Sequence, residues 1–250
     1  MVPSLGGLLF ERLGRKRTFR LAAAIVLANA LGIVGLSGVA PPEKHVEKET
    51  NDDVQKESLI ASSKRLISNR DVLAVTASTF MIHAVVGVIK PLAMVVLDTE
   101  FGQGIVKRSF STSIATAAFF VSAPVSGYLS DHMSRSHLVA LSLLIMFGSS
   151  ALFALRHLGI GIFYVGLALL GVALGMQKSS SQSLLADLVD KHELGDYSMI
   201  YALSDVADSL GLIVGPILGL WLAQVFSKSV GVLAIGALCL LIAPVVWRIQ

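Results

Sequence analysis

Seven apolar stretches, each long enough to cross a lipid bilayer, restrict this chain to very few folds. A membrane-spanning helix needs about 20 predominantly apolar residues. The stretches are residues 19–40, 72–97, 110–129, 138–155, 160–188, 197–226 and 230–247. Residues 2–10 are also apolar but too short to span. Because backbone polar groups inside a bilayer must be satisfied within the chain, the sequence predicts an all-α polytopic membrane protein.

Charged residues are scarce and are mostly kept out of these stretches. They make up 15% of the 250 residues, against about 25% in globular domains. Four lie deep within predicted spans, namely Lys90, Lys178, Asp205 and Asp208. The net charge of +3 is small and the basic residues are scattered, which argues against a nucleic-acid partner. No catalytic constellation, phosphate loop or zinc motif is found, so we expect no enzyme activity, cofactor or metal.

The predicted span with the most informative pattern contains residues 201–222. Asp205 and Asp208 are three residues apart and therefore share one helical face. A charge within a span costs about 2.5–3.5 kcal/mol on insertion scales, so this face should line a cavity within the protein. The small residues that follow would let a second helix approach closely; they are Gly211, Gly215, Pro216 and Gly219. The combination favours a transport pathway over a simple anchor.

A polar segment of mixed charge, residues 43–71, is the longest loop and the natural boundary between modules. We therefore predict three regions: 1–40, 41–71 and a six-helix bundle over 72–250. Lysine and arginine counts on alternate sides of the predicted spans are equal, so the positive-inside rule predicts no orientation.

Three motifs resemble the major facilitator superfamily. Residues 127–135, GYLSDHMSR, are similar to its loop motif Gly-x-Leu-x-Asp-x-x-Gly-Arg through Gly127, Asp131 and Arg135, with Ser134 replacing a glycine. The glycine-proline run 211–219 resembles the second-half copy of the signature of proton-linked antiporters. Residues 2–16 resemble the end of that signature in the fifth helix. They also fit the loop after the second helix, but the polar segment 43–71 favours the fifth-helix assignment.

This resemblance implies that residues 72–250 are the C-terminal six-helix half of a facilitator. One helix and the stub of the fifth would precede it, with a cytoplasmic central loop. The likeness is greatest to the drug:proton antiporter branch that contains the vesicular amine transporters. That branch carries acids where this chain has Lys90 and Lys178. This chain keeps a third acid of the branch as Asp205, and its Asp208 is an additional acid. Two lysines in place of acids argue against a monoamine substrate.

Each candidate residue has a functional and a structural interpretation. Asp205 and Asp208 are predicted to couple proton movement to transport or to form structural ion pairs with Lys90 and Lys178. The lysines could alternatively bind an anionic solute. His83 lies two helical turns before Lys90 and could relay protons or pack. Gln177 and the serines that follow could line the pathway or join helices. The glycines are expected to pack helices against each other. Gly215-Pro216 is also expected to form a bend that limits leak. Asp131 and Arg135 are expected to make gate contacts with neighbouring helices.

The sequence therefore predicts a secondary transporter, exchanging protons for a small organic solute by antiport. The alternative is a half-transporter that acts as a non-transporting membrane interaction protein, or an incomplete gene model. Expected partners are the solute, protons, the lipid bilayer and either the N-terminal half or another half. The expected location is a multi-pass position in the plasma membrane or in a vacuolar or vesicular membrane.

Overall fold

The computed structural model describes residues 66, 68–192, 197–225 and 227–249, together with five isolated positions between 17 and 31. Six of its helices are long and apolar enough to cross a membrane, which confirms the six spans predicted after residue 71. The predicted span 19–40, the stretch 2–10 and most of segment 43–71 lie outside the described residues. The helices are α3 (Arg70–Thr99), α4 (Ile105–Ser130), α5 (Arg135–Ala154), the short η1 (Arg156–Leu158), α6 (Ile160–Lys191), α7 (Tyr197–Val225) and α8 (Lys228–Trp247).

Local signals fix where these helices start. The Asn69 side chain caps α3 by accepting hydrogen bonds from the backbone N–H groups of Asp71 and Val72. Gly102 and Gly159 adopt φ values of +57° and +141° in the turns before α4 and α6, a region that side chains with a Cβ rarely enter. The α4 helix begins five residues before its predicted apolar stretch, since it includes a polar first turn.

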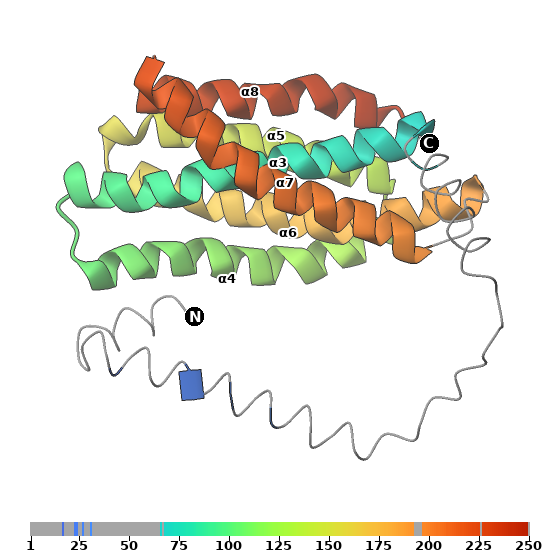
Figure 1. Cartoon of the computed structure of the whole chain (residues 1–250), viewed down its shortest axis with the longest axis horizontal. Coiled ribbons are helices and arrows are strands. Elements are labelled where there is room, and N and C mark those ends of the chain that lie inside the picture. The colour runs from blue at the N-terminus through green and yellow to red at the C-terminus, as the bar shows by residue number, and fades with distance from the viewer. Residues whose placement is uncertain are drawn as a thin grey trace, which may run out of the picture.

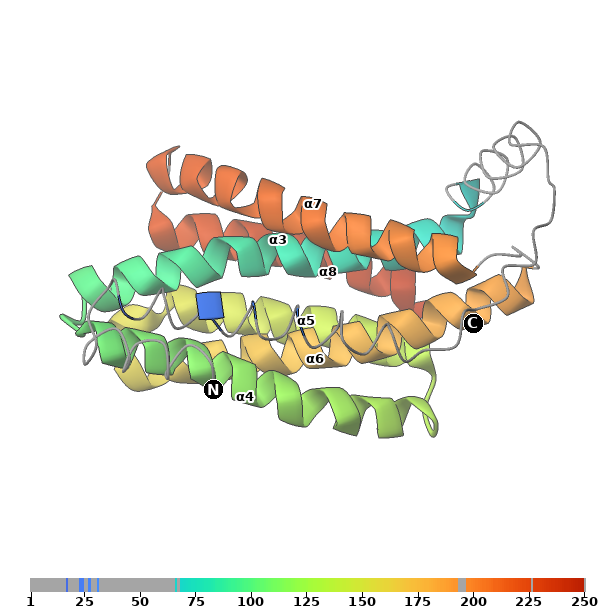
Figure 2. The ribbon, with the colours of Figure 1, turned by 60° about the horizontal axis from the view of Figure 1, so that its bottom comes forward.

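The helices lie side by side in two layers (Figures 1 and 2). One layer contains α3, α7 and α8, and the other contains α4, α5 and α6. Within the layers, α3 packs on α7 and α6 packs on both α4 and α5. The layers meet where α5 packs on α8 and α3 on α6. This arrangement brings α3, α6 and α7, the helices that carry the predicted charged residues, together inside the bundle.

Glycines bring α3 and α7 into backbone contact. A β-carbon on Gly211 would lie 2.5 Å from the carbonyl oxygen of Phe80, and one on Gly219 would lie 2.5 Å from Cγ1 of Val88. Gly215 lies between them, against the carbonyl oxygen of Ala84. The three glycines thus lie where α7 approaches α3 closely. Since residues further along α7 contact residues further along α3, the two helices run parallel.

A second glycine contact joins α4 and α6 in the other layer. Gly171 faces the backbone of Ala115, and Gly175 faces Ser122 and the carbonyl oxygen of Phe119. Further along, Gly127 faces the hydroxyl of Ser179. The bundle therefore contains two closely packed helix pairs, α3 with α7 and α4 with α6.

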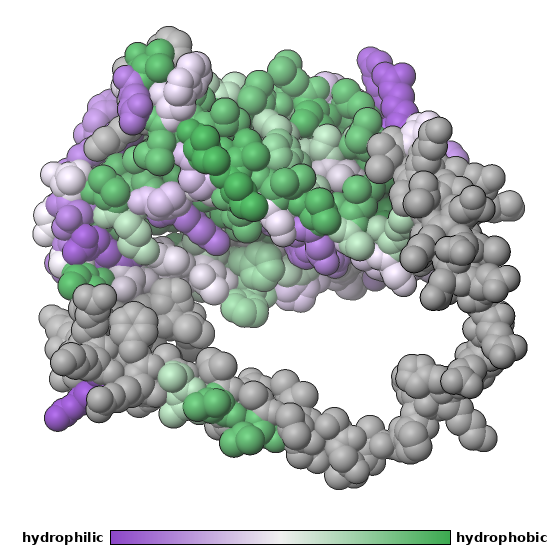
Figure 3. Space-filling model, viewed as in Figure 1, coloured by the Kyte–Doolittle hydropathy of each residue, from purple (hydrophilic) through white to green (hydrophobic). Residues whose placement is uncertain are grey.

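Apolar side chains cover much of the outer surface. The face seen in Figure 3 is hydrophobic over α7 and α8, and hydrophilic groups gather toward the ends of the bundle. Among the exposed apolar side chains are Ile213 and Ile217 on α7 and Leu241 on α8. A soluble protein would rarely expose so large an apolar area. The chain is therefore an integral, multi-pass membrane protein.

Candidate functional site

The two aspartates of α7 meet a lysine from α6. Lys178 Nζ lies 2.8 Å from Oδ2 of Asp208 and 3.2 Å from Oδ1 of Asp205. The spacing of three residues on α7 points both carboxylates toward the same part of α6, as the sequence predicts. The Asp208 side chain is 15% exposed, whereas that of Asp205 is 68% exposed. Asp208 is therefore the inner member of this triad.

His83 of α3 completes the cluster from the opposite side of Asp208. Its Nδ1 lies 3.1 Å from Oδ1 of Asp208 and 2.9 Å from the backbone carbonyl oxygen of Thr79. The hydrogen bond of Nδ1 goes to the carbonyl. The carboxylate oxygen is within ion-pair distance of Nδ1, but Oδ1 makes no hydrogen bond to any described group. One oxygen of Asp208 thus binds lysine, while the other is next to a neutral or protonated imidazole.

These residues open onto a pocket of about 360 Å³ between the two helix pairs. Its apolar lining comes from α3, α4, α6 and α7 and includes Phe119 on α4, which nothing in the sequence singles out. Its lining residues are His83, Val86, Lys90, Ala115, Thr116, Phe119, Leu170, Leu174, Lys178, Asp208 and Leu212. The walls suit a small solute with an apolar body and polar groups at one end.

Lys90 lines this pocket but stands apart from the carboxylates. Within the described part of the chain it forms no ion pair or hydrogen bond, so its predicted pairing with the aspartates is not found. The reason is geometric: Lys90 lies about 10 Å along α3 from His83, and Lys178 already occupies both carboxylates. Lys90 therefore adds a positive charge to the pocket away from the triad.

Gln177 faces away from the pocket and joins three helices. It is fully buried; its Oε1 accepts a hydrogen bond from Ser142 of α5 at 2.6 Å. Its Nε2 donates to Ser78 and Thr79 of α3 at 2.9 and 3.2 Å. Of the two interpretations left open by the sequence, the position of Gln177 fits helix packing. No sequence signal identifies Ser142, Ser78 and Thr79 as its partners.

The motif residues of the loop between α4 and α5 lie at one end of the bundle. Arg135 donates a hydrogen bond to the carbonyl oxygen of Ser183 at 3.0 Å and forms an ion pair with Asp187, both on α6. Asp131 caps the end of α4, and its exposed side chain makes no ion pair in the described ranges. Arg135 thus contacts a neighbouring helix, while its gating role and that of Asp131 stay a prediction; no pattern in the sequence identifies Asp187 as its partner.

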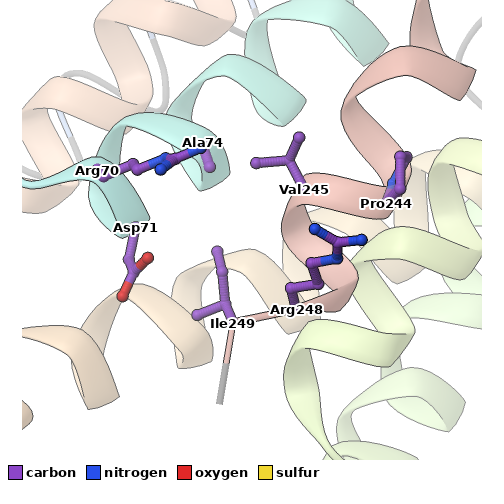
Figure 4. A pocket seen from close by; sticks show the side chains of 7 residues that line it. All are labelled: Arg70, Asp71, Ala74, Pro244, Val245, Arg248 and Ile249. Atoms are coloured by element: carbon purple, nitrogen blue, oxygen red, sulfur yellow. The ribbon is translucent and has the colours of Figure 1, made fainter.

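A different pocket, of about 430 Å³, lies between the start of α3 and the end of α8 (Figure 4). Arg70 and Asp71 come from α3, and Arg248 follows α8. It contains none of the candidate residues, and no ion pair joins two of its lining residues in the part of the chain that the structure describes. The pocket with the triad is therefore the better candidate site. Across the described residues, no group of three or more His, Cys, Asp or Glu side chains could hold a metal ion.

Comparison with known proteins agrees with this architecture. The family model of the Major Facilitator Superfamily matches residues 1–205 and 75–250. A human synaptic vesicular amine transporter is 27% identical over 245 residues, covering 97% of this chain and 45% of the relative. A multi-drug resistance efflux pump PmrA homolog of Lactococcus lactis is 25% identical over 259 residues, covering 98% of this chain and 58% of the relative. A rat chromaffin granule amine transporter is 24% identical over 247 residues, 98% of this chain and 45% of the relative.

The chain thus spans about half of the length of these relatives. Its helical membrane fold, its glycine-packed helix pairs and the family match over nearly all of its residues lead to one assignment. The chain belongs to the Major Facilitator Superfamily.

Proposed function

We propose that this chain works in proton-coupled antiport of a small organic solute, with Asp208 as the proton-accepting residue. One observation carries this proposal: a largely buried carboxylate is bound by Lys178 and lies next to His83 at the wall of an open pocket. Ionisable groups within a membrane span are costly and mark transport pathways.

Competition for a single carboxylate would provide the coupling. When Asp208 is ionised, Oδ2 binds Lys178 and Oδ1 can accept a hydrogen bond from an N–H or O–H group of a solute. When Asp208 is protonated, Lys178 keeps only Asp205 as a partner. The carboxyl group then carries no negative charge to attract the donor group of the solute, so the solute is bound less tightly. Proton and solute then exclude each other, as antiport requires.

The burial of the two carboxylates favours Asp208 over Asp205 in this role. Asp205 has the position that the family resemblance implied, but most of its side chain is exposed. An exposed carboxylate exchanges its lysine partner for water at little cost. The half-buried carboxylate of Asp208 changes its interactions more than that of Asp205 when it gains a proton, so Asp208 is the better coupling group.

The test is transport in proteoliposomes with an imposed pH gradient, using the protein at its natural full length. Amines, polyamines and organic anions would first be screened by thermal shift. Asp208→Asn should abolish gradient-driven flux, while Asp98→Asn, which removes an exposed partner of Arg108, should leave it unchanged. Full gradient-driven flux through Asp208→Asn would refute the role of this carboxylate.

A second candidate is a membrane interaction protein that does not transport. It is favoured by the exposed apolar side chains beside the pocket, including Phe120 and Val121 on α4 and Ile213 on α7. Such a face would bind another set of helices. This candidate predicts that the chain associates stably with a partner half but shows no solute-dependent proton movement. Substrate-dependent flux would exclude it.

A further inference from the structure

Four buried polar atoms make no hydrogen bond to any described group, and they come from three adjacent helices. They are Thr76 Oγ1 on α3, Ser181 Oγ on α6, and Ser204 Oγ and Asp208 Oδ1 on α7. Leaving a polar atom buried and unpaired costs about 1–3 kcal/mol. Four such atoms on adjacent helices require an explanation, because most other buried hydroxyls in the described ranges are hydrogen-bonded, for example those of Ser126, Ser142 and Ser149.

The glycine contacts place Thr76 and Ser204 at the same level. Gly211 of α7 packs against His83 of α3, and the two helices run parallel. Ser204 lies seven residues before Gly211 on α7, and Thr76 lies seven residues before His83 on α3. Seven residues are two helical turns, so both hydroxyls lie about 10 Å before that contact and on the faces that meet there.

The hydrogen bonds of Gln177 place Ser181 at this level as well. Gln177 of α6 contacts Ser78 and Thr79 of α3, and these helices run antiparallel. Ser181 lies one turn after Gln177 on α6. Because the helices are antiparallel, this level corresponds to one turn before Thr79 on α3, close to Thr76. We call Thr76, Ser181 and Ser204 the hydroxyl layer. Ser204 is one turn from Asp208 on α7, so the layer lies directly beside the triad.

A completely apolar layer follows on the far side of the hydroxyls. Val72, Leu185 and Ile200 are each one helical turn from Thr76, Ser181 and Ser204, respectively, toward the end where α3 and α7 begin. All three are fully buried and belong to the same hydrophobic cluster. We call them the aliphatic layer.

We propose that water molecules bridge the hydroxyl layer to Oδ1 of Asp208 and form a proton path, which the aliphatic layer closes. This inference rests on the proposed role of Asp208 as the proton acceptor. Hydroxyls both donate and accept hydrogen bonds, so they can hold a chain of waters in either direction. Buried water commonly satisfies polar groups of this kind. An apolar constriction interrupts such a chain by excluding water.

The path predicts a proton leak when the aliphatic layer is made polar. Val72→Thr changes shape little and adds one hydroxyl in line with Thr76. In proteoliposomes containing the full chain and an internal pH dye, without any solute, it should raise passive proton entry about threefold or more. Val139→Thr is the matched control, because Val139 is equally buried in the same cluster but lies on α5. It should not leak.

Removing the hydroxyl layer should close the leak again. Adding Thr76→Val and Ser204→Ala to Val72→Thr should return proton entry to the wild-type rate. Ile200→Ser serves as a second opening variant if Val72→Thr folds poorly. Absence of a leak from both opening variants, or a leak that survives removal of the hydroxyls, would overturn the proposed path.

The leak measurement separates this inference from the proposed function. A leak that depends on the hydroxyls in a chain that moves no solute would refute antiport and support the path. Gradient-driven solute flux without any leak in the opening variants would support antiport and refute the path.

Discussion

Arg156 and Lys178 are both paired with carboxylates, but their surroundings differ in how completely the polar groups are satisfied. Arg156 uses Nε and Nη2 to bind both oxygens of Glu100, at 2.9 and 3.0 Å. Its Nη1 donates to Ser229 at 2.8 Å, and the guanidinium lies over the ring of Phe153. This cluster joins the end of α3, η1 and the start of α8.

The Lys178 cluster is incomplete by comparison. A flexible lysine divides its contacts between two aspartates, and one oxygen of Asp208 has no hydrogen bond to a described group. Bidentate arginine pairs are fixed in geometry and always charged, whereas lysine makes a point contact that can move. The Arg156 cluster therefore joins its three elements with fixed geometry, whereas the looser contacts of Lys178 are consistent with the proposed change when Asp208 gains a proton.

Of the two cations, Lys178 should have the larger effect on transport when it is replaced. Lys178→Gln leaves Asp205 and Asp208 without the lysine that they share. Gradient-driven flux should fall at least tenfold, measured in proteoliposomes. In the double variant Lys178→Gln/Asp208→Asn, thermal stability should recover although flux does not, because the uncompensated charge is gone. A double variant that is less stable than Lys178→Gln would contradict the triad.

Replacing Arg156 should affect stability and leave coupling intact. Arg156→Ala leaves Glu100 without its partner and should lower the free energy of unfolding by about 2–3 kcal/mol, given that Glu100 is partly exposed. Thermal unfolding in detergent measures this change. The protein that remains folded should retain the pH dependence of its flux; a shifted pH profile would place Arg156 in the coupling machinery.

Removing Ser229 tests the arginine cluster more gently. Ser229→Ala removes one hydrogen bond to a charged group and should cost about 1.5 kcal/mol of unfolding free energy or less. Ser113→Ala, which removes a hydroxyl bonded only to its own helix, is the matched control. Equal shifts in melting temperature for the two variants would show that Ser229 does not support Arg156.

The smallest change is expected for the outer carboxylate. Asp205→Asn keeps the shape of the side chain and leaves the 2.8 Å contact of Lys178 with Asp208 in place. Because Asp205 is largely exposed, flux should change by no more than about twofold to threefold. Initial rates at saturating solute measure this effect, and complete loss of flux would reverse the assigned roles of the two aspartates.

Much of this architecture could be predicted from the sequence because membranes impose strong rules. Apolar length identifies the six spans after residue 71, and the glycine run 211–219 indicates a close helix contact. The spacing of Asp205 and Asp208 likewise predicts that they share one helical face. In each case the relevant information is local, within one helix.

The remaining features depend on which helices become neighbours. Both lysines are plausible partners for the aspartates in sequence, and packing alone selects Lys178 over Lys90. Gln177 and Lys178 are adjacent in sequence but point in different directions, and only the position of α5 shows that Gln177 is a packing residue. The Arg156–Glu100 pair joins two turns 56 residues apart, which helical periodicity cannot predict.

The glycine contacts also have a mechanical consequence. Since α7 meets the backbone of α3 at Gly211 and Gly215 and the side chain of Val88 at Gly219, neither helix can slide past the other without steric collision, and the two should move as one rigid unit. Lys178 belongs to the other glycine-packed pair. Its contact with Asp208 therefore connects the two pairs. Under the proposed function, protonation of Asp208 would weaken this connection and leave the packing within each pair unchanged.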